Sequence, residues 1–184
     1  MRWEALFGDL EAQFDEADAV EFAAEVSDRT RREYALIRLV DRLRPAQGHR
    51  VGVRVWGLGA VEGDVAAVGA DWVLLVEPGG REALVPSSAI VSVAGLGALS
   101  ATPHSEGEVA ARLRLGVVLR ALARDRSAVT IGYVDGATST GTIDRVGADF
   151  VEVAEHPAAE ARRPATVRAV RTIPFAGLAV VRRA

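Results

Sequence analysis

The sequence predicts an α+β protein that is mainly β, with two tandem five-stranded barrels, each preceded by an α-helix, and one further helix at the N-terminus. Three observations lead to this prediction. The tetrapeptide V-G-A-D occurs twice, at residues 68–71 and 146–149. Short apolar runs that alternate with polar residues and are separated by turn residues surround both copies. Apolar residues at helical spacing precede each group of runs.

The first 28 residues predict an acidic, amphipathic helix. This segment contains nine acidic residues and one arginine. Its apolar side chains recur at the spacing that places them along one side of a helix: Trp3, Leu6, Phe7, Leu10 and Phe14. Because such a stripe needs an apolar surface to cover it, we expect residues 1–28 to bind a protein partner.

The first repeat, residues 29–98, predicts a helix followed by five strands. Thr30 and Glu33 have the T-x-x-E spacing of a capping box that begins the helix, and Pro45 ends it. The stretches RVGVRVW, AVEGDVAAV, DWVLLVE, REALVP and AIVSV then follow at short spacing. Five strands within about fifty residues are typical of a small barrel.

The second repeat, residues 104–184, predicts the same series of elements. Ser105 and Glu108 form another capping box, and the helix that follows runs to about Arg126. Its strands follow directly, and the stretch HPAAEARRP at residues 156–164 predicts a flexible loop in place of a tight turn.

A constant offset aligns the two repeats without a gap. Residues 51–77 match the second copy at an offset of 78, and the preceding helix positions match at an offset of 79. Self-similarity over this length is the signature of a duplicated structural unit. We therefore expect superposable five-stranded barrels over residues 48–96 and 127–177.

Both repeats resemble the Sm-like family, which includes the Hfq-like proteins. GDVAAVGADWVLLV is similar to the first signature of that family, G-x-L-x-x-F-D-x-x-M-N-L-x-L. Gly63 and Gly141 stand where the family has the second-strand glycine that permits a sharp bend. The resemblance implies small barrels whose edge strands pair. We expect an internal pairing that makes a pseudo-twofold monomer, or a small ring such as a dimer or trimer.

The family's nucleotide pocket is not reproduced. Its signature Asp and Asn fall on Gly69 and Val73 in the first repeat, and Ser87 and Ser88 stand where Hfq-like proteins have Lys and His. The stretches MRWEALFGDLEAQF and DRTRREYALIRLVDRLR also resemble an uncharacterised actinobacterial family, sometimes labelled as a Fis-type regulator. No helix-turn-helix pair supports that label.

The repeated bends contain an aspartate and an aromatic residue each. Asp71 and Asp149 could bind a ligand, but an Asp at a tight bend usually bonds its own backbone, so we interpret both as turn residues. Trp72 and Phe150 could stack on bases, but repeated aromatic residues at one barrel position are more often core.

The sequence offers no catalytic, cofactor or metal site. It has no cysteine, and His49, His104 and His156 stand at loop-like positions without a second ligand at metal-binding spacing. No hydrolase, zinc-protease, P-loop or dinucleotide motif occurs. No apolar run approaches the roughly 20 residues of a membrane-spanning helix, and no export signal is visible. We expect a non-enzymatic protein of the cytoplasm.

Charge is segregated along the chain although the net charge is only −3. All 22 basic residues are arginines, and residues 29–54 and 162–183 are rich in them. If these segments meet in space, they form a basic surface that can contact phosphates. The candidate contacts are Arg54, Arg81, Arg145, Arg168 and Arg171.

Three functional classes follow from these patterns. The first is binding of RNA or other nucleic acid through arginine-rich surfaces with little sequence preference. The alternative is a protein assembly or scaffold module that uses barrel edges and the N-terminal helix. An enzyme is the third class and has the least support. A contiguous basic groove would favour the first class, and scattered arginines would favour the second.

Overall fold

The computed structural model describes residues 22, 25–103, 105, 107–160 and 162–183. The chain divides into two compact units, Met1–Ile37 and Arg38–Ala184, and each is described by itself. Most of the expected acidic helix, residues 1–28, lies outside the described residues. No helix in the described ranges is both long and apolar enough to cross a membrane.

The first unit is helical at residues 25–35. Thr30 lies inside this helix, where its hydroxyl donates to the carbonyl of Val26 at 2.8 Å. Glu33 accepts from Arg29 Nε at 3.1 Å instead of closing a capping box. The prediction that Thr30 begins a helix is therefore wrong, because the helical segment starts upstream of it.

The second unit is built on one ten-stranded antiparallel sheet, with five strands in each half as the repeats predict. The last strand lies at Leu178–Arg183, so the predicted end of the second barrel at residue 177 is wrong. The strands of the first half are β1 (Arg50–Val55), β2 (Gly59–Val68), β3 (Trp72–Val76), β4 (Glu82–Pro86) and β5 (Ile90–Ala94). Those of the second half are β6 (Ala128–Tyr133), β7 (Thr138–Val146), β8 (Phe150–Glu155), β9 (Ala169–Pro174) and β10 (Leu178–Arg183).

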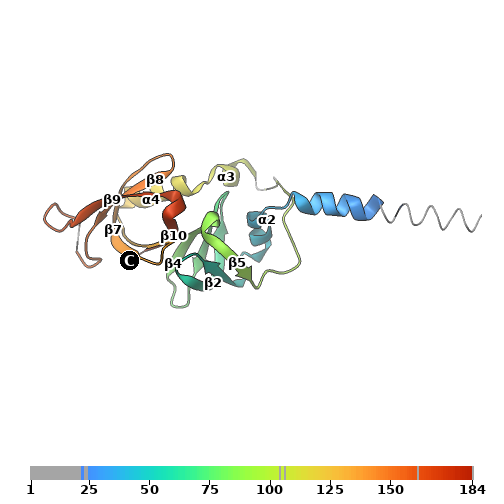
Figure 1. Ribbon diagram of the computed structural model, residues 1–184, viewed down its shortest axis with the longest axis horizontal. Coiled ribbons are helices and arrows are strands. Elements are labelled where there is room, and N and C mark those ends of the chain that lie inside the picture. The colour runs from blue at the N-terminus through green and yellow to red at the C-terminus, as the bar shows by residue number, and fades with distance from the viewer. Residues whose placement is uncertain (1–21, 23–24, 104, 106, 161, 184) are drawn as a thin grey trace, which may run out of the picture. The chain divides into compact units, whose positions relative to one another are not determined.

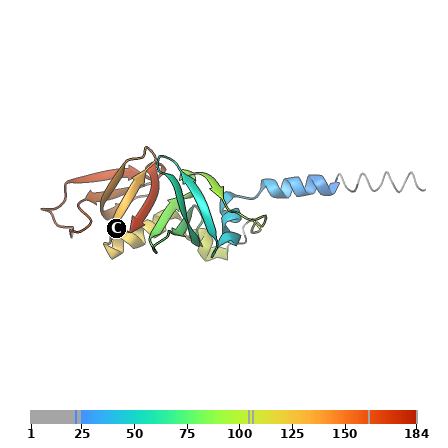
Figure 2. The ribbon, with the colours of Figure 1, turned by 90° about the horizontal axis from the view of Figure 1, so that it is seen from below.

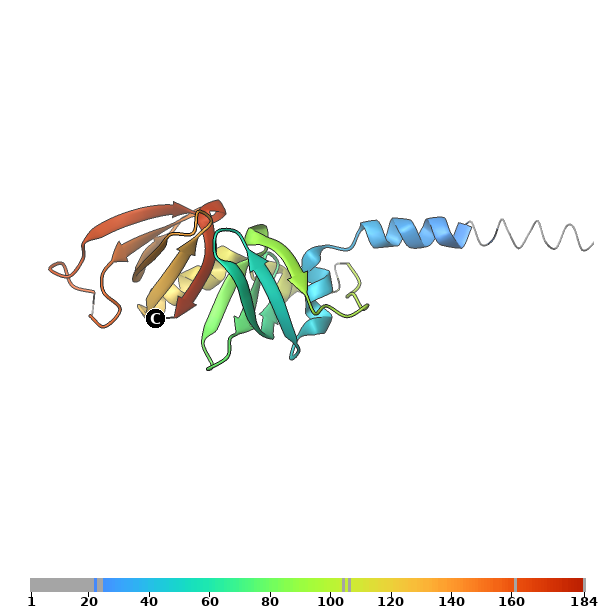
Figure 3. The same cartoon turned by 60° about the horizontal axis from the view of Figure 1, so that its bottom comes forward.

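The sheet is open, and the strand order is β5-β1-β2-β3-β4-β10-β6-β7-β8-β9. The prediction of two closed barrels is not confirmed. Strand β4 pairs with β10 of the other half and not with β5 of its own half, so the two halves form one continuous sheet (Figure 3).

The junction between the halves is head-to-tail. Strand β4 is the fourth strand of its half, whereas β10 is the fifth strand of the other. A twofold relation would pair equivalent strands, so the expected internal pairing is present but its pseudo-twofold symmetry is wrong. Such a junction leaves a β5 edge at one end and a β9 edge at the other (Figure 1).

Each helix that precedes the strands is broken by an extended residue. In the first half, α2 (Leu39–Leu43) and the 3₁₀ helix η1 (Arg44–Ala46) follow Arg38, whose φ and ψ are −87° and 161°. In the second, α3 (Gly107–Arg112) ends before Arg114, with φ −82° and ψ 159°, and α4 (Leu115–Asp125) follows. Two further 3₁₀ helices, η2 (Ser87–Ala89) and η3 (Phe175–Gly177), precede the last strand of each half.

The two breaks correct the helix alignment. Arg38 and Arg114 occupy the same position before α2 and α4, which sets the helix offset at 76 and not 79. Leu43 and Leu119 are then equivalent, and both are fully buried. The continuous helices predicted in each repeat are therefore wrong.

Two hydrophobic clusters stabilise the second unit. One lies mainly in the first half, includes Leu43, Val53 and Leu75, and also contains Ala179 and Val180 of β10. The other joins α4 to strands of both halves and includes Trp72 and Leu119, so α4 lies against the junction (Figure 2). Burial of apolar side chains contributes roughly 25 cal/mol per Å², and both clusters hold the two halves together because each contains residues of both.

The second strand of each half needs a glycine where the backbone of the third strand comes close to it. A Cβ at Gly63 would lie 2.5 Å from the carbonyl oxygen of Val76, and one at Gly141 would overlap the carbonyl oxygen of Ala154. The backbones of β3 and β8 therefore lie so close to Gly63 and Gly141 that no residue with a side chain fits at these positions.

Candidate functional site

The V-G-A-D phrase forms a bend in which an aromatic ring folds back over a glycine. Gly69 N–H donates to the carbonyl of Trp72 at 2.9 Å, and a Cβ on Gly69 would overlap the indole ring. The carbonyl of Asp71 accepts from Ser87 N–H at 2.9 Å and from its hydroxyl at 3.0 Å. The bend is thereby held to the 3₁₀ helix η2 that precedes β5.

This first bend also holds the start of α4. The Asp71 carboxylate accepts from Leu115 N–H at 2.7 Å. The Trp72 ring donates through Nε1 to the carbonyl of Leu113 at 2.8 Å, and Ala70 N–H donates to the same carbonyl at 3.2 Å. The interpretation of Asp71 as a self-bonded turn residue is wrong, because its carboxylate bonds a helix 44 positions away.

The second bend has the same internal structure and a different environment. Gly147 N–H donates to the carbonyl of Phe150 at 2.8 Å, and the Asp149 carbonyl accepts from Phe175 N–H at 2.7 Å. A Cβ on Gly147 would overlap the phenyl ring. Asp149 is exposed, and within the described ranges no hydrogen bond or ion pair of its carboxylate is present. Phe150 is half-buried, whereas Trp72 is only 6% exposed.

An ion pair accompanies the strand junction. Val181 lies opposite Leu84, and Arg182 lies opposite Ala83. The Arg182 guanidinium donates to both carboxylate oxygens of Glu77, at 2.9 and 3.0 Å. These bonds hold the pKa of Glu77 below its usual value of 4.5, against the opposing effect of burial.

The outer edges of the sheet differ from the junction in exposure. Most residues of β4 and β10 are buried, whereas β5 and β9 are mostly exposed. Val91 in β5 is 47% exposed and Val170 in β9 is 59% exposed. Exposed apolar edge strands are surfaces at which another strand can pair.

The five arginines expected to contact nucleic acid do not form one free basic surface. Three of them lie beside carboxylates: Arg81 beside Glu77 at 3.1 Å, Arg145 beside Glu152 at 3.8 Å and Arg171 beside Glu155 at 2.7 Å. The hydrogen bond from Arg171 holds the pKa of Glu155 below its usual value. Arg54 in β1 and Arg168 before β9 are exposed.

The structure brings Arg168 and Arg171 together at one cavity of about 450 Å³. Glu155 and His156 also line this cavity, so its charges are mixed. His156 is only 3% exposed, and its ring contacts the Thr142 hydroxyl at 2.8 Å and the Pro157 carbonyl at 2.9 Å. His156 lies just after β8, outside the strands as expected, but its ring is buried and hydrogen-bonded.

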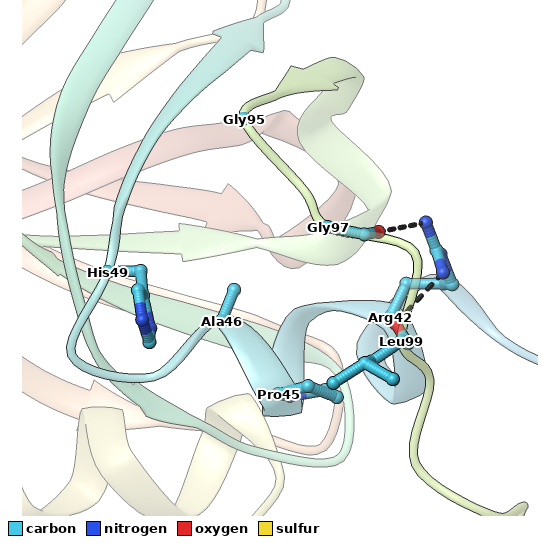
Figure 4. Close-up of a pocket in the computed structure, with 7 residues that line it drawn as sticks. All are labelled: Arg42, Pro45, Ala46, His49, Gly95, Gly97 and Leu99. Carbon is cyan, nitrogen blue, oxygen red and sulfur yellow. Dashed lines mark hydrogen bonds between the residues drawn. The ribbon is translucent and has the colours of Figure 1, made fainter.

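A second cavity, of about 290 Å³, lies between η1 and the residues after β5 (Figure 4). Its one arginine, Arg42, points to the segment after β5 and donates to the carbonyls of Gly97, Ala98 and Leu99 at 2.7 to 2.8 Å. The guanidinium is occupied by the backbone, so this cavity offers little for recognition of a charged ligand.

No group of three or more His, Asp or Glu side chains in the described part of the chain is arranged to hold a metal ion. A scan against protein-family models finds no family that matches the chain, and comparisons with curated proteins and with solved structures find no match either. The sites that remain for interpretation are the two bends and the two outer strand edges.

The sequence carried one usable signal for these sites, the repeated phrase itself. It did not show that the first bend holds a helix of the second repeat. That contact depends on the β4–β10 junction, which places α4 beside Asp71 and Trp72.

Proposed function

We propose that the protein is a non-catalytic assembly module that associates with further copies of itself through the outer edges of its sheet. The observation that carries this proposal is the head-to-tail β4–β10 junction. A head-to-tail interface leaves complementary surfaces at its two ends, and repetition generates rings or filaments. Here those surfaces are β9, the counterpart of β4, and β5, the counterpart of β10.

The internal register predicts the register between copies. Pro86 and Pro174 occupy equivalent positions, opposite Trp72 and Phe150. By the same alignment, Thr172 of one copy lies opposite Val93 of the next.

Charge supports this register. The internal junction places Arg182 opposite Ala83, with Glu77 as the partner of the arginine. In the outer pair, Arg171 lies opposite Ala94, and Glu155 is the partner of the arginine. Each junction thus contains one arginine facing one alanine and avoids two like charges directly opposite each other.

A charge-relocation series tests the proposal. Ala94→Arg places two arginines opposite each other, at a position whose counterpart, Arg182, already tolerates arginine. We expect it to weaken self-association about two- to fivefold, since like charges opposite each other are unfavourable. Arg171→Ala together with Ala94→Arg reproduces the internal junction and restores association. Sedimentation velocity over a concentration series measures each variant.

A strictly monomeric wild-type chain at high concentration would overturn the proposal. So would self-association that Ala94→Arg leaves unchanged, because the β5 edge would then lie outside the interface. Thermal unfolding of each variant, measured at low concentration, controls for loss of the fold.

Nucleic-acid binding is the second candidate, and the exposed residues Arg54 and Arg168 favour it. It requires binding through phosphates, with a steep loss of affinity as salt rises. The ion pairs of Arg81, Arg145 and Arg171 favour assembly over this candidate. Fluorescence anisotropy with mixed single-stranded RNA and DNA at low salt distinguishes the two: absence of binding removes nucleic acid as the ligand.

The Sm-like relationship is also a proposal. Each half has a helical segment followed by five strands in the order fifth, first, second, third, fourth, with a close-approach glycine in its second strand. These features support two Sm-like halves that share one sheet. An experimental structure in which β2 and β7 do not bend at Gly63 and Gly141 would contradict the relationship.

A further inference from the structure

We propose that the second bend, Gly147–Phe150, is a docking point on the self-assembly surface, and that it holds the Arg38–Leu39 turn of a second copy. The inference rests on the self-association proposed above and adds a contact outside the paired strands. The Asp149 carboxylate accepts a hydrogen bond from Leu39 N–H of the second copy, and Phe150 covers the Leu39 side chain.

The precedent is inside the chain. At the internal junction, the half that contributes β10 also contributes the Arg114–Leu115 turn, and Asp71 accepts from Leu115 N–H at 2.7 Å. The second half therefore contacts the first half twice, through β10 at β4 and through the Arg114–Leu115 turn at the first bend. A second copy that pairs β5 with β9 presents its own equivalent turn in the same place.

The two turns are built alike. Arg38 and Arg114 both have extended backbones, with ψ values of 161° and 159°, and each precedes a leucine that begins a helical segment. The two leucines differ in exposure: Leu115 is 4% exposed beneath the first bend, whereas Leu39 is 38% exposed. The difference is expected if Leu39 is covered by a contact that one chain cannot make.

The two bends are also built alike. In both, the glycine N–H bonds the aromatic carbonyl at 2.8 to 2.9 Å, and the ring folds over the glycine. Asp149 and Phe150 are more exposed than Asp71 and Trp72, which α4 covers. The second bend therefore presents the docking geometry of the first without an occupant from its own described residues.

One difference between the bends has a functional consequence. Phe150 lacks the ring N–H through which Trp72 donates to the Leu113 carbonyl at 2.8 Å. The contact between copies therefore has one hydrogen bond fewer than the internal one. This difference suits an interface that forms reversibly, whereas the internal junction is permanent.

Single substitutions in the full-length protein test the inference, with association measured by sedimentation velocity. Asp149→Ala removes an exposed carboxylate and should weaken self-association about tenfold or more, as loss of a hydrogen bond to a charged group does. Asp64→Ala removes another exposed carboxylate and should leave association unchanged. Phe150→Trp supplies the missing ring donor and should tighten association about three- to tenfold.

The outcomes separate this inference from the proposed function. If the wild-type chain associates and Ala94→Arg weakens it, but Asp149→Ala and Phe150→Trp behave like the wild type, the strand-edge proposal stands and the docking of Arg38–Leu39 is refuted. If the wild-type chain is monomeric, both are refuted. Tightening by Phe150→Trp with an unchanged thermal unfolding midpoint supports the docking directly.

Discussion

Replacing Asp71 with alanine should destabilise the second unit without altering its strands. Asp71 accepts from Leu115 N–H at 2.7 Å, and Arg114, at the cap position of α4, provides no side-chain cap. Loss of a capping carboxylate costs about 1–2 kcal/mol. For a unit of this size, that corresponds to a fall of about 3–6 °C in the unfolding midpoint.

Urea unfolding followed by tryptophan fluorescence measures this loss. We expect a lower midpoint concentration with an unchanged slope, since the surface exposed on unfolding stays the same. Asp149→Ala is the matched control. It removes the equivalent carboxylate, which makes no contact within the described residues, and at low protein concentration it should cost less than about 0.5 kcal/mol. Equal losses in the two variants would refute the assignment of Asp71 as the cap of α4.

Two further predictions follow from buried groups. Trp72→Ala should cost about 3–5 kcal/mol, since the ring is 6% exposed in the cluster beneath α4. Trp72→Phe keeps an aromatic ring but loses the ring N–H and part of the indole, and should cost less, about 1–3 kcal/mol by the same urea assay; a small loss for both would place the ring outside the core. Hydrogen bonds from Arg38 hold the pKa of the buried Asp41 carboxyl below its usual value of 3.8. Its stabilisation is complete above that value and is lost as the pH falls through the lower folded pKa. Asp41→Asn should therefore flatten the acid branch of the stability profile, and an unchanged branch would contradict this.

Strand positions could be predicted from the sequence because their signal is local. In β1, Val51, Val53 and Val55 alternate with more exposed residues, and the burial pattern follows that alternation. The repeat predicted the second set of strands for the same reason, since equivalent residues have equivalent neighbours along the chain. The prediction that Trp72 belongs to the core is also confirmed by its burial.

The helix breaks were less visible because competing local signals were present. Leu36 and Leu39 continue an apolar pattern across the break. The Asp41 carboxylate instead accepts from the N–H of the extended residue Arg38 at 3.0 Å. This hydrogen bond fixes the start of α2 directly after Arg38. The hydrogen bond from Arg38 N–H to the Asp41 side chain thus decides where the helix begins, although the apolar pattern continues across the break.

The candidate site depended on contacts between distant residues. Glu77 and Arg182 are 105 positions apart, and Asp71 and Leu115 are 44 apart. Sequence alone determined the two repeats, their strands and the shared bend. Only the tertiary structure decided that β4 pairs with β10, that arginines lie against carboxylates, and that one bend is occupied while its copy is exposed. The physical reason is that edge pairing depends on which strands are left unpaired after each half has formed, and no local pattern encodes that choice.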